Sequence, residues 1–412
     1  MVPSDEIPGL CGPDSEVDAM ATEAGRTGVA CGGDARDEET PARRSRGFVV
    51  LLAVTFLAFV DYAALLPVVP LWSASGGAGS AAVGATTGVM MAATVATQLA
   101  APWLFRMLSL RAMVAIGAVL LGAPTPLYLL SADLAPIVAI TVVRGVGFAF
   151  VVTAGATLVA ELAAGGKLSS AASLYGTAAA LPNLGALAGG VWAARTWGFG
   201  PVFWGAAVAC LGGAALALLL PRGHRAAFRL GAVAEVRRIA APVALFLSTA
   251  ASFGAATTFL PVAVRSADAA SWALLAASVA LVAARLGAGA VGDRYGAGRL
   301  LPIAVLSCAA GSALLAAALW GAPALLLPGA LLLGAGFGAC QNDSFVLTVR
   351  LLGEGRSGAA STIWNIAYDG GLGLGAAVLG GVIGRAGYAG AFLGLAAGVA
   401  AWAIVLAQRS RE

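Results

Sequence analysis

The sequence predicts an all-α integral membrane protein, with twelve transmembrane helices arranged as two six-helix bundles. Three observations lead to this prediction: the composition, a succession of apolar runs, and an internal repeat. Of the 412 residues, 60% are hydrophobic and only 11% are charged, and the mean hydropathy is +0.90. A water-soluble chain has about a quarter of its residues charged. The composition therefore places most of this chain in a bilayer.

Twelve apolar runs follow one another from residue 47 onward. A helix needs about 20 mostly apolar residues to cross a bilayer, and each run has roughly that length. The fifth run is the weakest of the twelve, because Gly and Pro are dense within it. The predicted spans are 48–72, 81–104, 112–132, 136–160, 169–193, 202–221, 242–265, 271–292, 299–320, 323–348, 358–384 and 388–408.

Charge divides the chain into domains. Residues 1–46 carry ten acidic residues and five arginines, and their polar, Gly- and Pro-rich composition predicts a disordered acidic tail. The remaining residues carry ten acids and nineteen basic residues, most of them between the apolar runs. The predicted organisation is the tail 1–46, a first bundle 47–221, a basic cytoplasmic linker 222–241, a second bundle 242–408 and a short tail 409–412.

The basic residues also predict an orientation, because Lys and Arg concentrate in cytoplasmic loops. With a cytoplasmic N-terminus, only Arg195, Arg265 and Arg385 fall outside. The even number of helices then places both termini in the cytoplasm. The composition is typical of a GC-rich bacterial genome, so we expect a multi-pass protein of the bacterial inner (plasma) membrane.

An internal repeat relates the two predicted bundles at an offset of about 190 residues. Parallel repeats of this kind are common in transporters. Four short matches occur in order and in corresponding helices. They pair 145–148 with 334–337 (GVGF and GAGF), 171–173 with 359–361 (both AAS), 184–185 with 372–373 (both LG), and 66–68 with 260–262 (both LPV).

The loop after the eighth predicted helix carries the most specific motif, in which Gly289, Asp293, Arg294 and Gly296 stand at the spacing G-x-x-x-D-R-x-G. With the six-plus-six helices and the basic central loop, it resembles the signature of the major facilitator superfamily over residues 47–408. The resemblance implies two bundles related by a pseudo-two-fold axis, and a loop whose Asp and Arg cap and clamp a neighbouring helix. The first-half copy keeps Arg111 but has lost its Gly and Asp positions.

Two further stretches resemble elements of this superfamily. Arg144 and the glycines that follow it are similar to an R-x-x-x-G element of proton-coupled members. Gly185, Gly189 and Gly190 are similar to a G-P-x-x-G-G element of antiporters, although Ala186 replaces the Pro. The second resemblance favours a drug- or metabolite-exporting antiporter.

Charged residues inside a membrane cost several kcal/mol, so each marks a candidate functional site. Asp61 in the first predicted helix lies ~20 Å from the inner face, and Arg144 in the fourth lies at ~24 Å. We expect these two side chains to pair and to couple transport to protons, although a static salt bridge is the alternative. The matching places in the other half hold Ala255 and Leu333.

Three more charges lie inside predicted helices of the second half. Arg285 and Asp343 each lie about eight residues from the inner face, and we expect them to pair, as a gate or as a structural bridge. Asp369 lies ~18 Å deep in the eleventh helix. It is a candidate for a second proton or for a cationic group, and a protonated, hydrogen-bonded Asp is the alternative.

Polar and aromatic side chains within the predicted helices are candidates for the wall of a substrate cavity, although for each one taken alone packing is the safer interpretation. The most polar group lies in the tenth helix. These candidates are Tyr62, Gln98, Asn183, Gln341, Asn342, Trp364, Asn365 and Tyr368.

These observations predict a proton-coupled secondary active transporter that exports a small organic molecule by alternating access. The alternatives are a proton symporter importing a sugar or other metabolite, and a non-transporting membrane sensor or assembly partner. No catalytic cluster or Walker A loop occurs, and His224 is the only histidine, so neither an enzyme, a metal site nor a cofactor is expected. The expected partners are the bilayer, protons and the solute, without nucleic acid, and the chain is expected to be monomeric.

Overall fold

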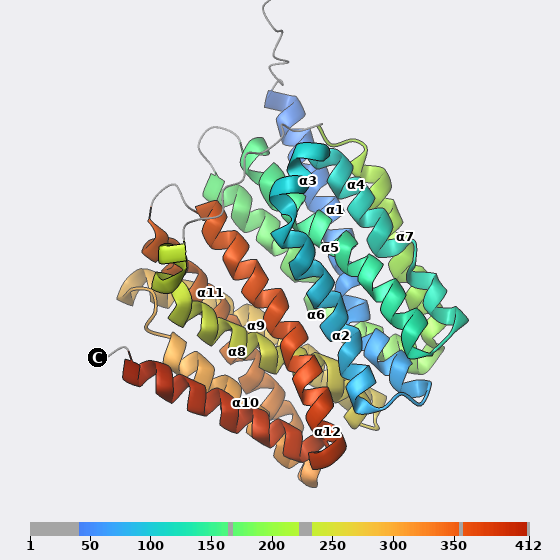
Figure 1. The fold of residues 1–412 in the computed structure, drawn as a ribbon, viewed down its shortest axis with the longest axis vertical. Coiled ribbons are helices and arrows are strands. Elements are labelled where there is room, and N and C mark those ends of the chain that lie inside the picture. Colours follow the sequence, from blue (N-terminus) through green and yellow to red (C-terminus); the bar gives the residue numbers. More distant parts are fainter. Residues whose placement is uncertain (1–40, 164–167, 222–232, 354–356, 410–412) are drawn as a thin grey trace, which may run out of the picture. The chain divides into compact units, whose positions relative to one another are not determined.

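The long apolar runs form α-helices, because a bilayer offers backbone N–H and C=O groups no water to bond. The computed structural model describes residues 41–163, 168–221, 233–353 and 357–409. Within these ranges the regular structure is helical and no strand occurs (Figure 1). Residues 1–40 of the predicted tail, 222–232 of the predicted linker and 410–412 lie outside the described residues, whereas 41–46 and 233–241 are helical. The domain boundaries therefore stay predictions.

The first half of the chain contributes seven α-helices and one short 3-10 helix. They are α1 (Pro41–Ser75), α2 (Ser80–Leu99), α3 (Ala101–Met107), α4 (Leu110–Gly122), η1 (Thr125–Leu130), α5 (Leu134–Leu162), α6 (Leu168–Trp197) and α7 (Phe199–Ala217).

The second half contributes five α-helices and one 3-10 turn. They are α8 (Val233–Ala263), α9 (Ala267–Tyr295), α10 (Leu301–Trp320), η2 (Pro323–Leu325), α11 (Leu326–Leu352) and α12 (Ser357–Arg409). Gly387 divides α12 into two helices, since its φ of 68° and ψ of 173° are not helical. This break lies where the sequence predicts the boundary between the last two spans.

Differences from the predicted spans arise mainly at prolines, which lack an N–H and clash with the preceding turn. The span predicted at 81–104 is divided between α2 and α3, next to Pro102. The span predicted at 112–132 is divided between α4 and η1, at Pro124 and Pro126.

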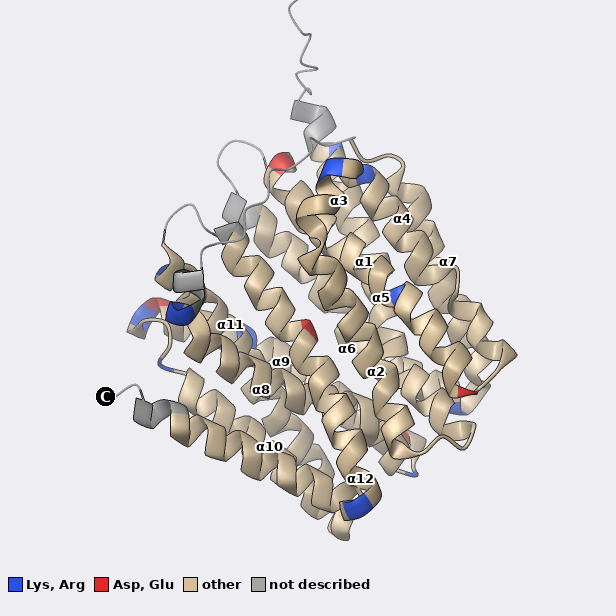
Figure 2. Cartoon of the chain, in the orientation of Figure 1, with Lys and Arg blue, Asp and Glu red and all other residues tan. Residues whose placement is uncertain are grey.

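The predicted fold class is confirmed. Ten described helices are long and apolar enough to cross a membrane, and the run Ala359–Val405, which Gly387 divides, counts as one of them. The Gly-rich α6 is not among the ten. Figure 2 shows most charged residues near the ends of the helices and few along their middles.

The helices of each half pack mainly on one another. In the first half α1 packs on α6 and α7, and α5 packs on α4 and α2. In the second half α8 packs on α12, and α9 and α10 pack on α11. The helix pairs that join the halves include α2 with α12, α6 with α9, α1 with α8, and α2 with α8. Figure 1 shows α2 and α12 side by side along this boundary.

The internal repeat is visible in the packing of two matched pairs of glycines. Gly145 of α5 lies against the backbone of α2, and its counterpart Gly334 of α11 lies against the backbone of α9. Gly147 lies against the backbone of α4, and its counterpart Gly336 lies against that of α10. A Cβ at any of these positions would clash with backbone. The repeated glycines therefore make equivalent close helix contacts in the two halves.

Candidate functional site

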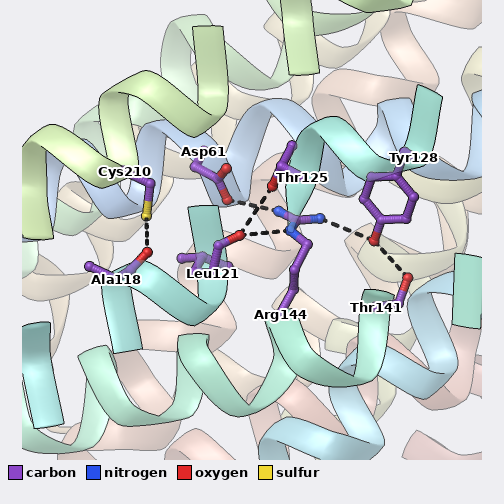
Figure 3. Close-up of polar contacts among 8 residues, drawn as sticks. All are labelled: Asp61, Ala118, Leu121, Thr125, Tyr128, Thr141, Arg144 and Cys210. Atoms are coloured by element: carbon purple, nitrogen blue, oxygen red, sulfur yellow. Dashed lines mark hydrogen bonds and ion pairs between the residues drawn. The ribbon is translucent and has the colours of Figure 1, made fainter. Parts of the chain in front are cut away.

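A buried ion pair lies within the first half of the chain. The Nη2 atom of Arg144 in α5 lies 2.7 Å from Oδ2 of Asp61 in α1 (Figure 3). The side chains are 1% and 0% exposed, respectively. The sequence-based pairing of these two residues is therefore seen in the structure.

Arg144 has two further partners, both in the same half. Its Nε donates to the carbonyl of Leu121 at 3.0 Å, and its Nη1 donates to the hydroxyl of Tyr128 at 3.5 Å. The Tyr128 hydroxyl also shares a hydrogen bond of 2.7 Å with Thr141. Three groups thus bind the Arg144 guanidinium, and the Thr141 hydroxyl bonds to one of them, Tyr128 (Figure 3).

Asp61 is held less completely. Its Oδ2 accepts from Arg144, whereas its Oδ1 is buried without a hydrogen-bond partner among the described residues. A buried carboxylate oxygen without a donor is costly, and a proton on that oxygen removes the charge that makes it so. The geometry therefore offers a place for one proton.

A small cavity lies beside Arg144 in the first half of the chain. It has a volume of about 10 Å³, and Arg144, Tyr128, Thr86 and Thr87 line part of it. This is about the space that one water needs. The Thr87 hydroxyl shares a hydrogen bond of 3.0 Å with Thr258 of α8, in the other half.

Asp369 lies at the boundary itself. Its Oδ2 accepts a hydrogen bond of 2.7 Å from Nε2 of Gln98, so the contact joins α12 to α2. Both side chains are buried, and Oε1 of Gln98 has no partner among the described residues. Gln98, which is predicted to line the cavity, therefore contacts Asp369, which is predicted to be a proton site.

Aromatic side chains from three helices gather beside Asp369 in the second half. The ring of Trp364 stacks on Phe246 at 4.5 Å and 11°, and Tyr368 lies 5.8 Å from Trp364. Phe337 of α11 stacks on Phe253 of α8 at 4.6 Å. In the first half, Tyr62 stacks on Phe148 at 4.1 Å and 6°. Trp364 and Tyr368 are half-buried, so they border open space.

The predicted pairing of Arg285 with Asp343 is wrong. Nη1 of Arg285 donates to Oε1 of Gln341 at 3.3 Å. Asp343 instead accepts from three backbone N–H groups at the start of α10, those of Gly298, Leu300 and Leu301, at 2.7 to 3.1 Å. The first N–H groups of a helix have no partner within it, and the carboxylate of Asp343 satisfies them.

The signature loop also differs from its predicted role. Asp293 and Arg294 are exposed, and Arg294 lies over the ring of Tyr295, 5.4 Å from its centroid. Neither clamps a neighbouring helix within the described part of the chain. Gly296 has a φ of +94°, which favours glycine. In the first-half loop, Arg111 donates to the carbonyl of Leu218 at 3.5 Å.

The remaining predicted cavity residues are not brought to one point. Asn183 and Asn365 each donate to a carbonyl one turn earlier in their own helix. Asn342 is half-buried and lies near Gly289, where a Cβ would be 3.8 Å from its Nδ2.

The glycine element of α6 has two roles. Gly190 lies against the backbone of Ala64 in α1, so this position needs a small residue. Gly185 and Gly189 instead line an open groove of about 360 Å³ between α6 and α9, together with Trp192 and Trp272.

The sequence gives no sign of one contact between the halves. The half-buried Arg195 at the end of α6 donates to the carbonyls of Arg265, at 2.7 Å, and Pro261. From the sequence, Arg195 is only a charged residue in a loop on the predicted outer side. Its contact could not be predicted, because its acceptors are backbone carbonyls, which every residue has. In the structure it joins the halves at that end.

Comparison with known proteins identifies the family. The model of the Major Facilitator Superfamily matches residues 51–376, most of the chain. This chain belongs to the Major Facilitator Superfamily. It is therefore a multi-pass membrane transporter, and its family is not one of enzymes. A search of curated proteins gave no match.

Solved structures of other superfamily transporters share the fold. The nucleoside transporter NupG has a TM-score of 0.69 and 15% identity, over 89% of this chain and 99% of its own. A POT family transporter in complex with a thioalcohol-conjugated peptide has 0.69 and 12%, over 89% and 96%. A D-xylose-proton symporter has 0.71 and 16%, over 87% and 96%. At these identities the similarity shows the fold alone.

Superfamily transporters work without a cofactor. Among the described residues, no group of three or more His, Cys, Asp or Glu side chains is placed to hold a metal ion.

Proposed function

We propose that this superfamily member is a proton-coupled secondary active transporter, in which Asp61 takes up and releases the coupling proton. The observation that carries the proposal is the fully buried Asp61–Arg144 ion pair, in which one carboxylate oxygen has no hydrogen-bond donor. Ionisable residues inside membrane proteins are costly, and they mark proton and substrate pathways.

Protonation of Asp61 removes the carboxylate charge that holds Nη2 of Arg144. The guanidinium keeps its bonds to Leu121 and Tyr128, so the N-terminal half can remain folded in both states. Arg144 and Thr87 line the same small cavity, and Thr87 bonds to Thr258 in the other half. A shift of Arg144 can therefore reach the boundary that rearranges in alternating access. A ligand or proton biases such an equilibrium only through its different affinity for the two states.

The test compares neutral variants in proteoliposomes with an imposed pH gradient. Asp61→Asn leaves Arg144 buried without a counter-ion, so loss of flux in this variant alone has two explanations. The double variant Asp61→Asn/Arg144→Gln removes both charges and avoids that cost. We expect it to reach the membrane in a stable form and to show no flux driven by the pH gradient. Gradient-driven flux at the wild-type level in the double variant would mean that the pair is only structural.

Export of a small organic molecule is the proposed direction. The support is the glycine element of α6, which borders the groove between α6 and α9 and resembles the element found in antiporters. The alternative is proton-coupled import of a sugar or other metabolite, and one structural neighbour is a D-xylose-proton symporter. Accumulation of a transported solute inside intact cells would favour import, and its depletion would favour export.

The proposed setting is the bacterial inner membrane, with both termini in the cytoplasm and the chain acting as a monomer. The distribution of basic residues supports the orientation. Labelling of single cysteines, introduced in the linker and in the loop after α8, tests it in intact cells. Linker labelling only after permeabilisation is the expected result.

A further inference from the structure

The second half of the chain contains a cation that no acid among its described residues neutralises. Arg285 lies ten residues from the inner end of α9, about 15 Å along the helix, near the middle of the bundle. Its hydrogen-bond partner is the neutral side chain of Gln341, which is buried on α11.

Both buried acids of this half, among the residues described, are engaged elsewhere. Asp343 is occupied by three backbone N–H groups at the start of α10. Asp369 accepts from Gln98 of the other half. Tyr368 and Asp369 are neighbours on α12, so their side chains point about 100° apart. The carboxylate faces α2, whereas the Tyr368 ring packs with Phe246, Phe337 and Trp364.

Arg285 lies beside this aromatic cluster. Its partner Gln341 lies one turn after Phe337 on α11, and the Phe337 ring lies 5.8 Å from that of Tyr368. Tyr62 of α1 has a buried hydroxyl without a hydrogen-bond partner among the described residues. Because α1 packs on α8, which carries Phe246 and Phe253 of the cluster, this hydroxyl comes from a helix that borders the cluster.

Space remains around the cation. Arg285, Trp364 and Tyr368 are all half-buried. Toward the inner end of α9, Gly289 and Gly292 follow one and two turns after Arg285. A Cβ at Gly289 would meet only Asn342, at 3.8 Å, and a Cβ at Gly292 would meet nothing within 4 Å. These two glycines therefore leave the face of α9 between Arg285 and the inner end of the helix uncrowded.

We propose that Arg285 binds the anionic group of a planar aromatic solute, whose ring packs on Trp364 and Tyr368. A guanidinium presents two parallel N–H groups that match a carboxylate, and a planar ring stacks on aromatic side chains. Gln341 positions the guanidinium, and the free hydroxyl of Tyr62 supplies a donor from the other half. This assignment rests on the proposed transport function, for which it names the substrate class: aromatic organic anions.

The test uses three probes with the same ring and different charge: 1-naphthoate, 1-naphthamide and 1-naphthylmethylamine. Binding to the purified full chain in detergent is measured by isothermal titration calorimetry. We expect wild-type protein to bind 1-naphthoate at least about tenfold more tightly than the amide, because a hydrogen bond to a charged group adds that much. The amine is expected to bind more weakly than the amide.

Variants locate the effect. Arg285→Gln should remove the preference for 1-naphthoate over the amide. Arg285→Lys should keep part of it, because the charge remains and the paired N–H groups are lost. Arg350→Gln removes an exposed positive charge from α11 of the same half and is the matched control, for which wild-type preference is expected. Trp364→Phe, which keeps an aromatic ring, should weaken the binding of 1-naphthoate and of the amide by similar factors.

Equal or absent binding of the three probes to wild-type protein would overturn the proposal, and so would an unchanged preference in Arg285→Gln. Melting temperatures of the variants show whether they are folded. Binding is measured without a pH gradient, so this test is independent of the test of the transport proposal. Arg285-dependent binding without gradient-driven flux contradicts proton coupling alone. Gradient-driven flux of some other solute, without any carboxylate preference, contradicts this assignment alone.

Discussion

Neutralising one partner of the Asp61–Arg144 pair should destabilise the protein far more than neutralising both. Asp61→Asn leaves the guanidinium of Arg144, which is 1% exposed, without its counter-ion. Removing one partner of a buried ion pair costs about 3–5 kcal/mol. Asn still offers an acceptor, and Leu121 and Tyr128 remain, so the lower end of this range is expected. Arg144→Gln leaves the buried Asp61 carboxylate without its counter-ion, at a similar cost as long as that group stays charged.

The double variant contains no uncompensated charge, and we expect it to lose only about 1–2 kcal/mol relative to wild type, because replacing a whole buried pair is often nearly neutral. The four proteins form a double-mutant cycle, measured by SDS-induced unfolding in mixed micelles. The expected coupling free energy is about 4 kcal/mol or more, above the usual range for neighbouring residues. Additive losses, with the double variant near the sum of the two single ones, would refute the view that these charges are mutually compensated.

Three further predictions concern contacts at the boundary between the halves and at a helix end. Arg195→Gln should lose charge-assisted hydrogen bonds worth about 1–3 kcal/mol at this half-buried position. The contact between α6 and α8 should then open, and spin labels on these two helices should show a broader distance distribution. Asp343→Ala should lower stability by about 2–4 kcal/mol, because three N–H groups at the start of α10 lose their acceptor; a change below 1 kcal/mol in unfolding would contradict this. Gly84→Val places a side chain on the backbone of Ala376 and should reduce flux severalfold, whereas Gly381→Val, where space is open on the same helix pair, should leave flux unchanged.

The Asp61–Arg144 pair could be predicted from the sequence because both residues lie at a similar depth in helices that pack together. Depth follows from counting residues along a helix at 1.5 Å per residue. The boundary at Gly387 could be predicted for a similar reason, since two apolar runs of sufficient length meet there. Both features follow from counting residues along the sequence.

The Asp343 contact could not be predicted in this way. Asp343 and Arg285 also lie at similar depths, but depth does not give the direction in which each side chain points. The N–H groups at the start of α10 need acceptors, and the Asp343 carboxylate of α11 accepts hydrogen bonds from them. Likewise, Gln98 and Asp369 are separated by 271 positions, and only the packing of α2 on α12 brings them together.

The most direct test of proton coupling at Asp61 is to measure proton movement that accompanies the solute. Proteoliposomes containing a trapped pH-sensitive dye are given a transported solute at equal pH on both sides. Wild-type protein should change the internal pH in proportion to solute movement. The Asp61→Asn/Arg144→Gln variant should still exchange labelled for unlabelled solute, but without a pH change. A pH change of wild-type size in that double variant would contradict the central claim, because the proton would then be carried elsewhere.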